Sequence, residues 1–294
     1  MLREREMIMS LKRILALASS GAGDATCLAF AAHLAAQHDA VVEVLPIYID
    51  SAVDMIALGM TLGATLSRQA VEELAAAERE LQDRIEAAAG RAANEADVVY
   101  GAGEGAPRLS VLGRGLRPAL ALSREAALAD LVVVAQTGIE AGSGGEILGQ
   151  ALLADRAPVL VARGEPERLS GAAAIAWDGS PQAGRAVRAA LPLLAMASRI
   201  HVLQCVSGLD RQAGDPDIAA LNAYLKLHGV GAGEATLVEG ADEGAALVAA
   251  AQGKEAGLLV AGAWGHSRLR EFVFGGATRS FLRAEGGPSV LLAH

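Results

Sequence analysis

The most unusual stretch of the chain is GAWGHSRLREFVFGGATR, in which glycines and basic side chains are closely spaced. Gly262 and Gly265 are followed, after nine further residues, by the pair Gly275 and Gly276. Glycines after a strand let a ligand approach the main chain without a Cβ atom in the way. The basic side chains of the stretch are His266, Arg268, Arg270 and Arg279. The pattern indicates either a phosphate site or a tight turn with solvated arginines, and these residues alone leave both open.

A helix is expected directly after this stretch, in the residues ATRSFLRAE. Thr278 would place a hydroxyl group in the first turn of this helix, and Arg279 and Arg283 would lie one turn apart on one face. The start of a helix offers unpaired N–H groups and a positive dipole end to an anion. A phosphate could therefore be held by main-chain amides, a hydroxyl group and guanidinium groups together.

A carboxylate is expected near the same edge of the sheet. Asp178 lies in IAWDGSPQAGRAV, where the first strand of the second half of the chain ends. Ser180 and Pro181 suit the N-cap and the first position of the next helix, so Asp178 is not needed as the cap. Ligands of doubly wound sheets bind beyond the carboxyl ends of the strands where the strand order reverses, and there Asp178 and Gly262 would face one crevice. The alternative is an ordinary Asp-Gly turn.

Other chemistries find little support in the sequence. The chain lacks the Gly-x4-Gly-Lys-Ser/Thr motif of P-loop NTPases, and GAGEGA at Gly101 follows the third expected strand, whereas a dinucleotide fingerprint follows the first. His266 has no partner at metal-ligand spacing. Cys27 and Cys205 lie in apolar contexts and are expected to be small buried side chains. No catalytic residue and no metal ligand are assigned.

Composition limits the class of partner. The net charge of -9 argues against nucleic acid or an anionic membrane as the main partner, because both require a broad basic surface. No apolar run approaches the ~20 residues of a membrane span. The charged start MLREREMIMS does not resemble a signal peptide. We therefore expect a cytoplasmic protein.

Short apolar runs alternate with long Ala-rich stretches, which predicts an α/β fold with parallel sheets. The expected strands of the first half are Arg13–Ser19, Val41–Ile49, Asp97–Gly101, Leu131–Ala135 and Pro158–Ala162. Those of the second half are Ala172–Trp177, Ile200–Val206, Ala235–Glu239, Gly257–Gly262 and Ser289–Ala293. The polar run Arg163–Gly171 is interpreted as a linker between domains at 10–163 and 171–294. The segment Ala52–Ala93 is longer than its counterpart and is interpreted as a solvated amphipathic helix that covers the sheet, with a partner-binding coil as the alternative.

The two halves match each other in three places in the same order. YGAGEGA (Tyr100–Ala106) matches EGADEGA (Glu239–Ala245), and each is expected to close a third strand and open a helix. ADLVVVAQTG matches AGLLVAGAWG, and APVLVAR matches PSVLLAH at the end of the chain. These matches indicate a duplication.

With this duplicated plan, an Asp after the first strand and Gly-x2-Gly-x9-Gly after the fourth, the chain resembles a tandem universal stress protein. The resemblance covers nearly the whole chain. It implies two flavodoxin-like (adenine-nucleotide α-hydrolase-like) domains in tandem, each a doubly wound five-stranded parallel sheet. It also implies ATP, ADP or AMP as ligand, with or without Mg²⁺, in a stress-response protein.

The resemblance carries roles onto residues of the second half. Asp178 and the main chain at Cys205 and Val206 would approach the nucleoside. Ribose and phosphates would be held by Gly262, Gly265, Gly275 and Thr278. The chemistry of the stretch itself adds the main chain at Gly276, the side chains of Arg268 and Arg279, and His266, which could contact phosphate or simply lie in the loop. In the family a Ser or Thr usually follows the last glycine of the motif directly, and here that position is Gly276. Thr278 preserves a second hydroxyl that is common in the family.

The first half departs further from the family pattern. If Gly21 matches Gly179, Ser20 stands at the position of Asp178, while Ala135 replaces Gly262 and Leu148 stands at the position of Gly275. One nucleotide per chain is therefore expected, in the second half. The last strand of each half is short and apolar, so the two are expected to pair edge to edge, as an intramolecular pseudo-dimer. A homodimer is a further alternative.

Two other functions remain open. SSGAGDATCLA (Ser19–Ala29) is similar to the Ser-Gly-Gly-x-Asp-Ser loop of ATP pyrophosphatases but departs from it at Ala22 and Ala25. A scaffold without ligand, which uses its sheet edges for dimerisation, is the third hypothesis. With no general base assigned beside the expected phosphates, any ATP hydrolysis is expected to be slow.

Overall fold

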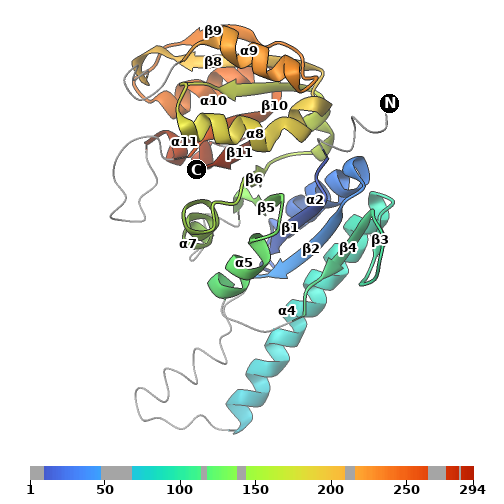
Figure 1. Ribbon diagram of the computed structural model, residues 1–294. Coiled ribbons are helices and arrows are strands. Elements are labelled where there is room, and N and C mark those ends of the chain that lie inside the picture. Colours follow the sequence, from blue (N-terminus) through green and yellow to red (C-terminus); the bar gives the residue numbers. More distant parts are fainter. Residues whose placement is uncertain are drawn as a thin grey trace.

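The computed structural model describes residues 10–47, 68–113, 118–137, 144–208, 216–263, 276–284 and 286–294. In this part of the chain the strands form one eleven-stranded sheet in the order β3-β4-β2-β1-β5-β6-β11-β10-β7-β8-β9 (Figure 1). The strands are β1 (Arg13–Ala18), β2 (Val41–Pro46), β3 (Val99–Tyr100), β4 (Arg108–Val111), β5 (Leu131–Ala135), β6 (Val159–Ala162), β7 (Ala172–Ala176), β8 (Arg199–Cys205), β9 (Glu234–Val238), β10 (Ala256–Gly262) and β11 (Ser289–Ala293). Neighbouring strands are parallel except β6 and β11. The expected α/β fold is confirmed.

Helices cover both faces of this sheet (Figure 1). One face carries α2 (Asp24–His38), α4 (Arg68–Glu95), α8 (Pro181–Met196) and α9 (Ile218–Leu227). The other carries α5 (Pro118–Ala126), α7 (Gly144–Gly149), the π-helical turn η2 (Gln150–Ala154), α10 (Glu243–Gly253) and α11 (Gly276–Arg283). Successive strand residues point to opposite faces, so that Ile14 and Ala16 join one apolar core and Leu15 and Leu17 the other.

The third strand of the first half differs from the expectation. Arg108–Val111 forms β4 and pairs with β2, whereas the expected strand Asp97–Gly101 is reduced to the two-residue β3 outside it. The Arg108 guanidinium donates to the carbonyl oxygens of Gly101 (3.1 Å) and Gly105 (3.2 Å) and so closes the turn between β3 and β4. YGAGEGA is therefore a turn between two strands, and its match to EGADEGA, which does close β9 and open α10, was wrong.

The two halves of the sheet join through their last strands. Val161, Leu160 and Val159 of β6 pair with Val290, Leu291 and Leu292 of β11 in antiparallel register. This is the edge-to-edge pairing that the sequence predicted. The run Arg163–Gly171 is ordered here: its 3₁₀ turn η3 (Pro166–Ser170) buries Leu169 completely. A Cβ atom at Gly257 of β10 would come within 1.9 Å of the Arg168 carbonyl oxygen, so the connection packs directly against the second half.

Among the described residues, none of the helices combines the length and the apolar character needed to span a bilayer.

Candidate functional site

The sheet of the second half reverses its strand order between β7 and β10. These two strands are parallel neighbours, with Ile175 opposite Val260. The helix that follows β7, α8, covers one face of the sheet, while α11, the next described helix after β10, covers the other. A doubly wound sheet opens a crevice at such a point, beyond the carboxyl ends of the strands. The adjacency on which the expected site depends is therefore present.

Asp178 lies at this edge, two residues after the end of β7. Its half-buried carboxylate accepts a hydrogen bond through Oδ1 from the Ser180 amide at 2.9 Å. Gly179 has φ 75°, a left-handed conformation that favours glycine. Ser180 is the N-cap of α8, because its Oγ accepts from the Ala183 amide at 3.1 Å, and Pro181 is the first helical residue. Asp178 thus makes an Asp-Gly turn, and its Oδ2 lies outside that hydrogen bond.

Gly262 ends β10 directly against the start of α8. A Cβ atom at this residue would come within 2.7 Å of the Ala183 nitrogen and 2.9 Å of the Gln182 carbonyl carbon. The absence of a side chain therefore lets α8 begin close to the end of β10. Gly262 is therefore needed for the packing of α8 against the sheet, whether or not a ligand also approaches its main chain.

The end of β8 borders the same edge. Cys205 is buried, while Val206 is 46% exposed at the start of the short turn η4 (Val206–Gly208). The Cys205 Sγ lies 3.3 Å from the Ser207 Oγ, which donates to the Gly240 carbonyl oxygen at 3.0 Å. These contacts tie the end of β8 to the loop after β9.

Only part of the glycine-rich stretch belongs to the described residues. Gly265, His266, Arg268, Arg270 and Gly275 lie outside them. Gly276 opens α11 with space around it, since a Cβ atom there would meet nothing within 4 Å. Thr278 is 3% exposed, so its side chain packs beneath the helix, whereas Arg279 and Arg283 are exposed.

An acidic residue lies beside the first turns of α11. Asp242 is the N-cap of α10 and accepts from the Ala245 amide at 2.9 Å. The Ser280 hydroxyl lies 2.8 Å from Oδ2 and 2.9 Å from Oδ1 of the same carboxylate. The hydrogen bond from the Ala245 amide, and to a smaller extent that from the Ser280 hydroxyl, holds the pKa of Asp242 below its ordinary value. This carboxylate is therefore ionised at neutral pH next to the helix that was expected to receive phosphate.

The corresponding turn of the first half is shifted by one residue from the expected alignment. The strand registers pair Ala16 with Val133 and Ile175 with Val260, two residues before the ends of β5 and β10. Ser19, and not Ser20, therefore stands at the position of Asp178. Ser20 has φ 60° and takes the left-handed conformation of Gly179.

In the first half, the amides of the turn after β1 are occupied by a carboxylate from the helix that follows. Asp24, the first residue of α2, is 7% exposed. It accepts from the Ser19 amide at 3.0 Å and from the Ser20 amide at 2.7 Å. The main-chain donors that an anion would need are thus occupied from within the chain.

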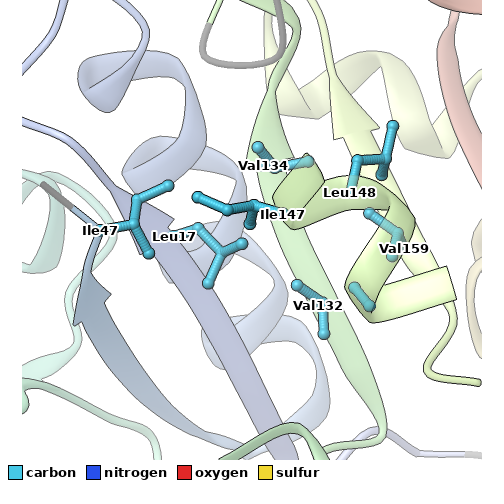
Figure 2. A pocket seen from close by; sticks show the side chains of 8 residues that line it. Leu17, Ile47, Val132, Val134, Ile147, Leu148 and Val159 are labelled. Carbon is cyan, nitrogen blue, oxygen red and sulfur yellow. The ribbon is translucent and has the colours of Figure 1, made fainter. Parts of the chain in front are cut away.

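The space beside β1 and β5 in the first half is apolar. Figure 2 shows Leu17 and Val134 facing Ile147 and Leu148 of α7 across a small hollow, with Ile47 at its side. Its volume is about 10 Å³, which is too small for a nucleotide. By strand register, Ala176 and Ala261 stand where the first half has Leu17 and Val134. The second half therefore carries smaller side chains at the equivalent positions.

Trp177 was not selected from the sequence, although it directly precedes Asp178. Its indole Nε1 is buried and has no hydrogen-bond partner in the structure. The sequence did contain a signal for Trp177. The chain has only two tryptophans, Trp177 and Trp264, and each closely follows the end of one of the two neighbouring strands β7 and β10.

Solved structures of similar fold are found, although no protein-family model matches the sequence and no curated protein matches it. A universal stress protein from Archaeoglobus fulgidus aligns with a TM-score of 0.67 at 14% identity, over 97% of this chain and 97% of that chain. A protein from Pseudomonas aeruginosa UCBPP-PA14, assigned to the universal stress proteins, aligns with a TM-score of 0.53 at 14% identity, over 97% and 94% of the two chains. A functionally unknown protein from Pseudomonas aeruginosa PAO1 gives the same TM-score and identity over 97% and 93%. The chain therefore has the fold of the universal stress proteins, and its length is that of a tandem chain of this fold.

Proposed function

We propose that the protein is a stress-response protein of the universal stress protein type that binds one adenine nucleotide in its second half. The division into domains at 10–163 and 171–294 is part of the proposal. One observation carries it: Asp178 lies just after β7 and Gly262 ends β10, and these two strands are parallel neighbours at the point where the sheet reverses its order. In sheets of this kind that point is where ligands bind, mono- and dinucleotides among them.

The ligand would lie across the carboxyl ends of β7, β8 and β10. Asp178 and the main chain at Cys205 and Val206 are assigned to the nucleoside, since Asp178 keeps Oδ2 outside its turn hydrogen bond and Val206 is exposed. The phosphates are assigned to Gly265, His266, Arg268 and Gly275, to the first amides of α11 from Gly276 to Thr278, and to Arg279. Because Thr278 is buried, its contribution is through the main chain.

The ligand is ATP, ADP or AMP. A group of three or more His, Cys, Asp or Glu side chains that could hold a metal ion is not found in the part of the chain that the structure describes. Mg²⁺ accompanying ATP would be carried mainly by phosphate oxygens and water, as is common for this ion. The proposal includes little or no catalysis and a location in the cytoplasm.

The ATP pyrophosphatase-like alternative is weakened by Ala22 and Ala25, which stand where the loop of that enzyme class has a glycine and a hydroxyl residue. The amides of Ser19 and Ser20 in this turn donate to the Asp24 carboxylate, so they are already paired within the chain. The ligand-free scaffold is the remaining alternative. Each half uses one edge of its sheet for the pairing of β6 with β11. The strands β3 and β9 are therefore the two outer edges of the eleven-stranded sheet.

Mass spectrometry of small molecules released on denaturing the freshly purified protein tests the proposal. An adenine nucleotide near one equivalent per chain is the expected result. Release of none, together with no binding of added ATP, would favour the scaffold. Pyrophosphate release after ATP addition would favour the enzyme.

A further inference from the structure

Two side chains of the first half hold the C-terminal end of α11 in the second half. Arg163, which follows β6, donates from Nη2 to the carbonyl oxygens of Leu282 (3.1 Å) and Phe281, and from Nη1 to that of Pro288 (2.9 Å). Gln136, which follows β5, donates from Nε2 to the carbonyl oxygens of Leu282 (2.9 Å) and Ala284 (3.2 Å).

These donors match what the end of a helix requires. The last carbonyl groups of an α-helix have no partner within the helix, and its C-terminus carries a partial negative charge. The Arg163 guanidinium supplies a positive charge there, and Arg163 as a whole is only 6% exposed. Its Nε donates to the Gln136 Oε1 at 2.7 Å, so the two side chains orient each other. They form one cap, which we call the Arg163–Gln136 cap.

The other end of α11 is the end assigned to the phosphates. The helix has eight residues, so about 12 Å separate its two ends. Its side is also fixed, because a Cβ atom at Gly244 of α10 would come within 2.5 Å of the Ala277 carbonyl oxygen. A short helix that is held at its C-terminus and at its side cannot shift at its N-terminus without breaking one of these contacts.

We propose that Arg163 and Gln136 are positioning residues for the nucleotide site of the second half. The first half then has a defined role: it does not bind the ligand, and it fixes α11 in the position at which the helix amides meet phosphate. This inference rests on the proposed function, because it concerns affinity at that site.

The test uses the full chain with three variants and one control. Arg163→Met removes the charge and all the guanidinium donors but keeps an unbranched side chain, Arg163→Lys keeps a cation, and Gln136→Met removes the amide. Ser289→Ala is the matched control. Ser289 lies at the same junction and its Oγ contacts only the main chain of Arg163 among the hydrogen bonds described, at 3.1 Å to N and 3.3 Å to O.

Three quantities are measured: hydrogen exchange of the amides of residues 280–284, the Kd for ATP and the melting temperature. We expect Arg163→Met to lose protection at these amides and to weaken ATP binding about tenfold, which is ~1.4 kcal/mol. Gln136→Met should give a smaller effect in the same direction, and Arg163→Lys should recover most of the affinity. Ser289→Ala should lower the melting temperature while leaving α11 protection and the ATP Kd unchanged.

The outcomes separate the two proposals. Unchanged ATP affinity in Arg163→Met and Gln136→Met, in a wild-type protein that binds ATP, overturns the positioning role. An equal loss in Ser289→Ala also overturns it, because the effect would then be general to the junction. A wild-type protein that binds no nucleotide refutes the proposed function, and α11 exchange then decides whether the cap holds the helix. Should Arg163→Met fail to fold, Gln136→Met compared with Ser289→Ala gives the decisive comparison.

Discussion

The backbone nitrogen of Ala183, in the first turn of α8, lies so close to Gly262 that a Cβ atom at residue 262 would come within 2.7 Å of it. The glycine that the sequence suggested for ligand approach is therefore also required for packing. A bulky residue there would abolish ligand binding by disturbing the start of α8, whether or not a phosphate lies nearby.

Gly262→Ala should accordingly destabilise the protein, whereas Gly276→Ala should not. We expect Gly262→Ala to lower the free energy of unfolding by about 1–3 kcal/mol, the usual cost of overpacking. Gly276 has open space, lies within a helix and has no positive φ, so an alanine there should be neutral or stabilise by up to about 1 kcal/mol. Urea unfolding of both variants measures the difference, and equal stability of the two would show that the contact at Gly262 is relaxed in solution.

Asp178→Ala should weaken nucleotide binding with little loss of stability. Removal of its bond to the Ser180 amide costs only about 1 kcal/mol, while loss of the nucleoside contact should raise the Kd for ATP and for adenosine by about tenfold or more. Tryptophan fluorescence follows the binding, since Trp177 and Trp264 closely follow the ends of β7 and β10.

Asp130→Ala is the control for that variant. Asp130 also accepts main-chain hydrogen bonds, from Lys12 (2.7 Å) and Arg13 (2.9 Å), but it lies at the opposite edge of the sheet, before β5. The Asp130→Ala variant should be less stable than the wild type and should bind the nucleotide with the same affinity. Equal ATP affinities in Asp178→Ala and the wild type would show that Asp178 only forms the turn and does not contact the nucleotide.

Asp242→Asn should strengthen the binding of polyphosphates. The carboxylate that accepts the Ser280 hydroxyl places a negative charge beside the start of α11, and asparagine removes the charge while remaining a good N-cap for α10. We expect the Kd for ATP to fall several-fold at low salt, with a smaller change for AMP, and the gain to diminish at high salt because salt screens such charges. Titrations at two salt concentrations measure this. A gain for adenosine as large as that for ATP would contradict the electrostatic explanation.

Asp24 should make stability depend on pH in a particular direction. Burial raises the pKa of this carboxyl above its ordinary value of 3.8, against the opposing hydrogen bonds from the Ser19 and Ser20 amides. The folded state therefore binds this proton more tightly than the unfolded state, and the contribution of Asp24 to stability falls as pH rises from 3.8 through the folded pKa.

The comparison is between wild type and Asp24→Ala. On acidification from neutral pH towards about pH 4, the stability of the wild type relative to the variant should increase. Chemical unfolding at several pH values gives this difference. A relative stability that decreases on acidification would mean that the hydrogen bonds outweigh burial.

The local features of the fold were predictable from the sequence. Leu131–Ala135 and Ser289–Ala293 are strands with the predicted bounds, because a strand buried on both faces is a continuous apolar run. Ser180 and Pro181 start α8 as predicted, because a cap depends on a few neighbouring residues.

Features that depend on distant contacts were not predictable in the same way. The sequence could not show that Arg108–Val111 pairs with β2, since Asp97–Gly101 is an equally good strand and the choice is made by pairing across the sheet. It could not show that Asp24 turns back onto Ser19 and Ser20, or that the Thr278 side chain points into the core. Roles of Gly265, His266, Arg268 and Gly275 stay predictions.

Isothermal titration calorimetry of the full chain with ATP tests the central claim most directly. One site per chain with a Kd in the micromolar range, about 8 kcal/mol of binding free energy, is the result that a single nucleotide site in the second half predicts. The first half should contribute no site, since its turn is closed by Asp24 and its hollow measures about 10 Å³. Two equivalent sites per chain, or no heat of binding in protein shown to be free of nucleotide, would contradict the account.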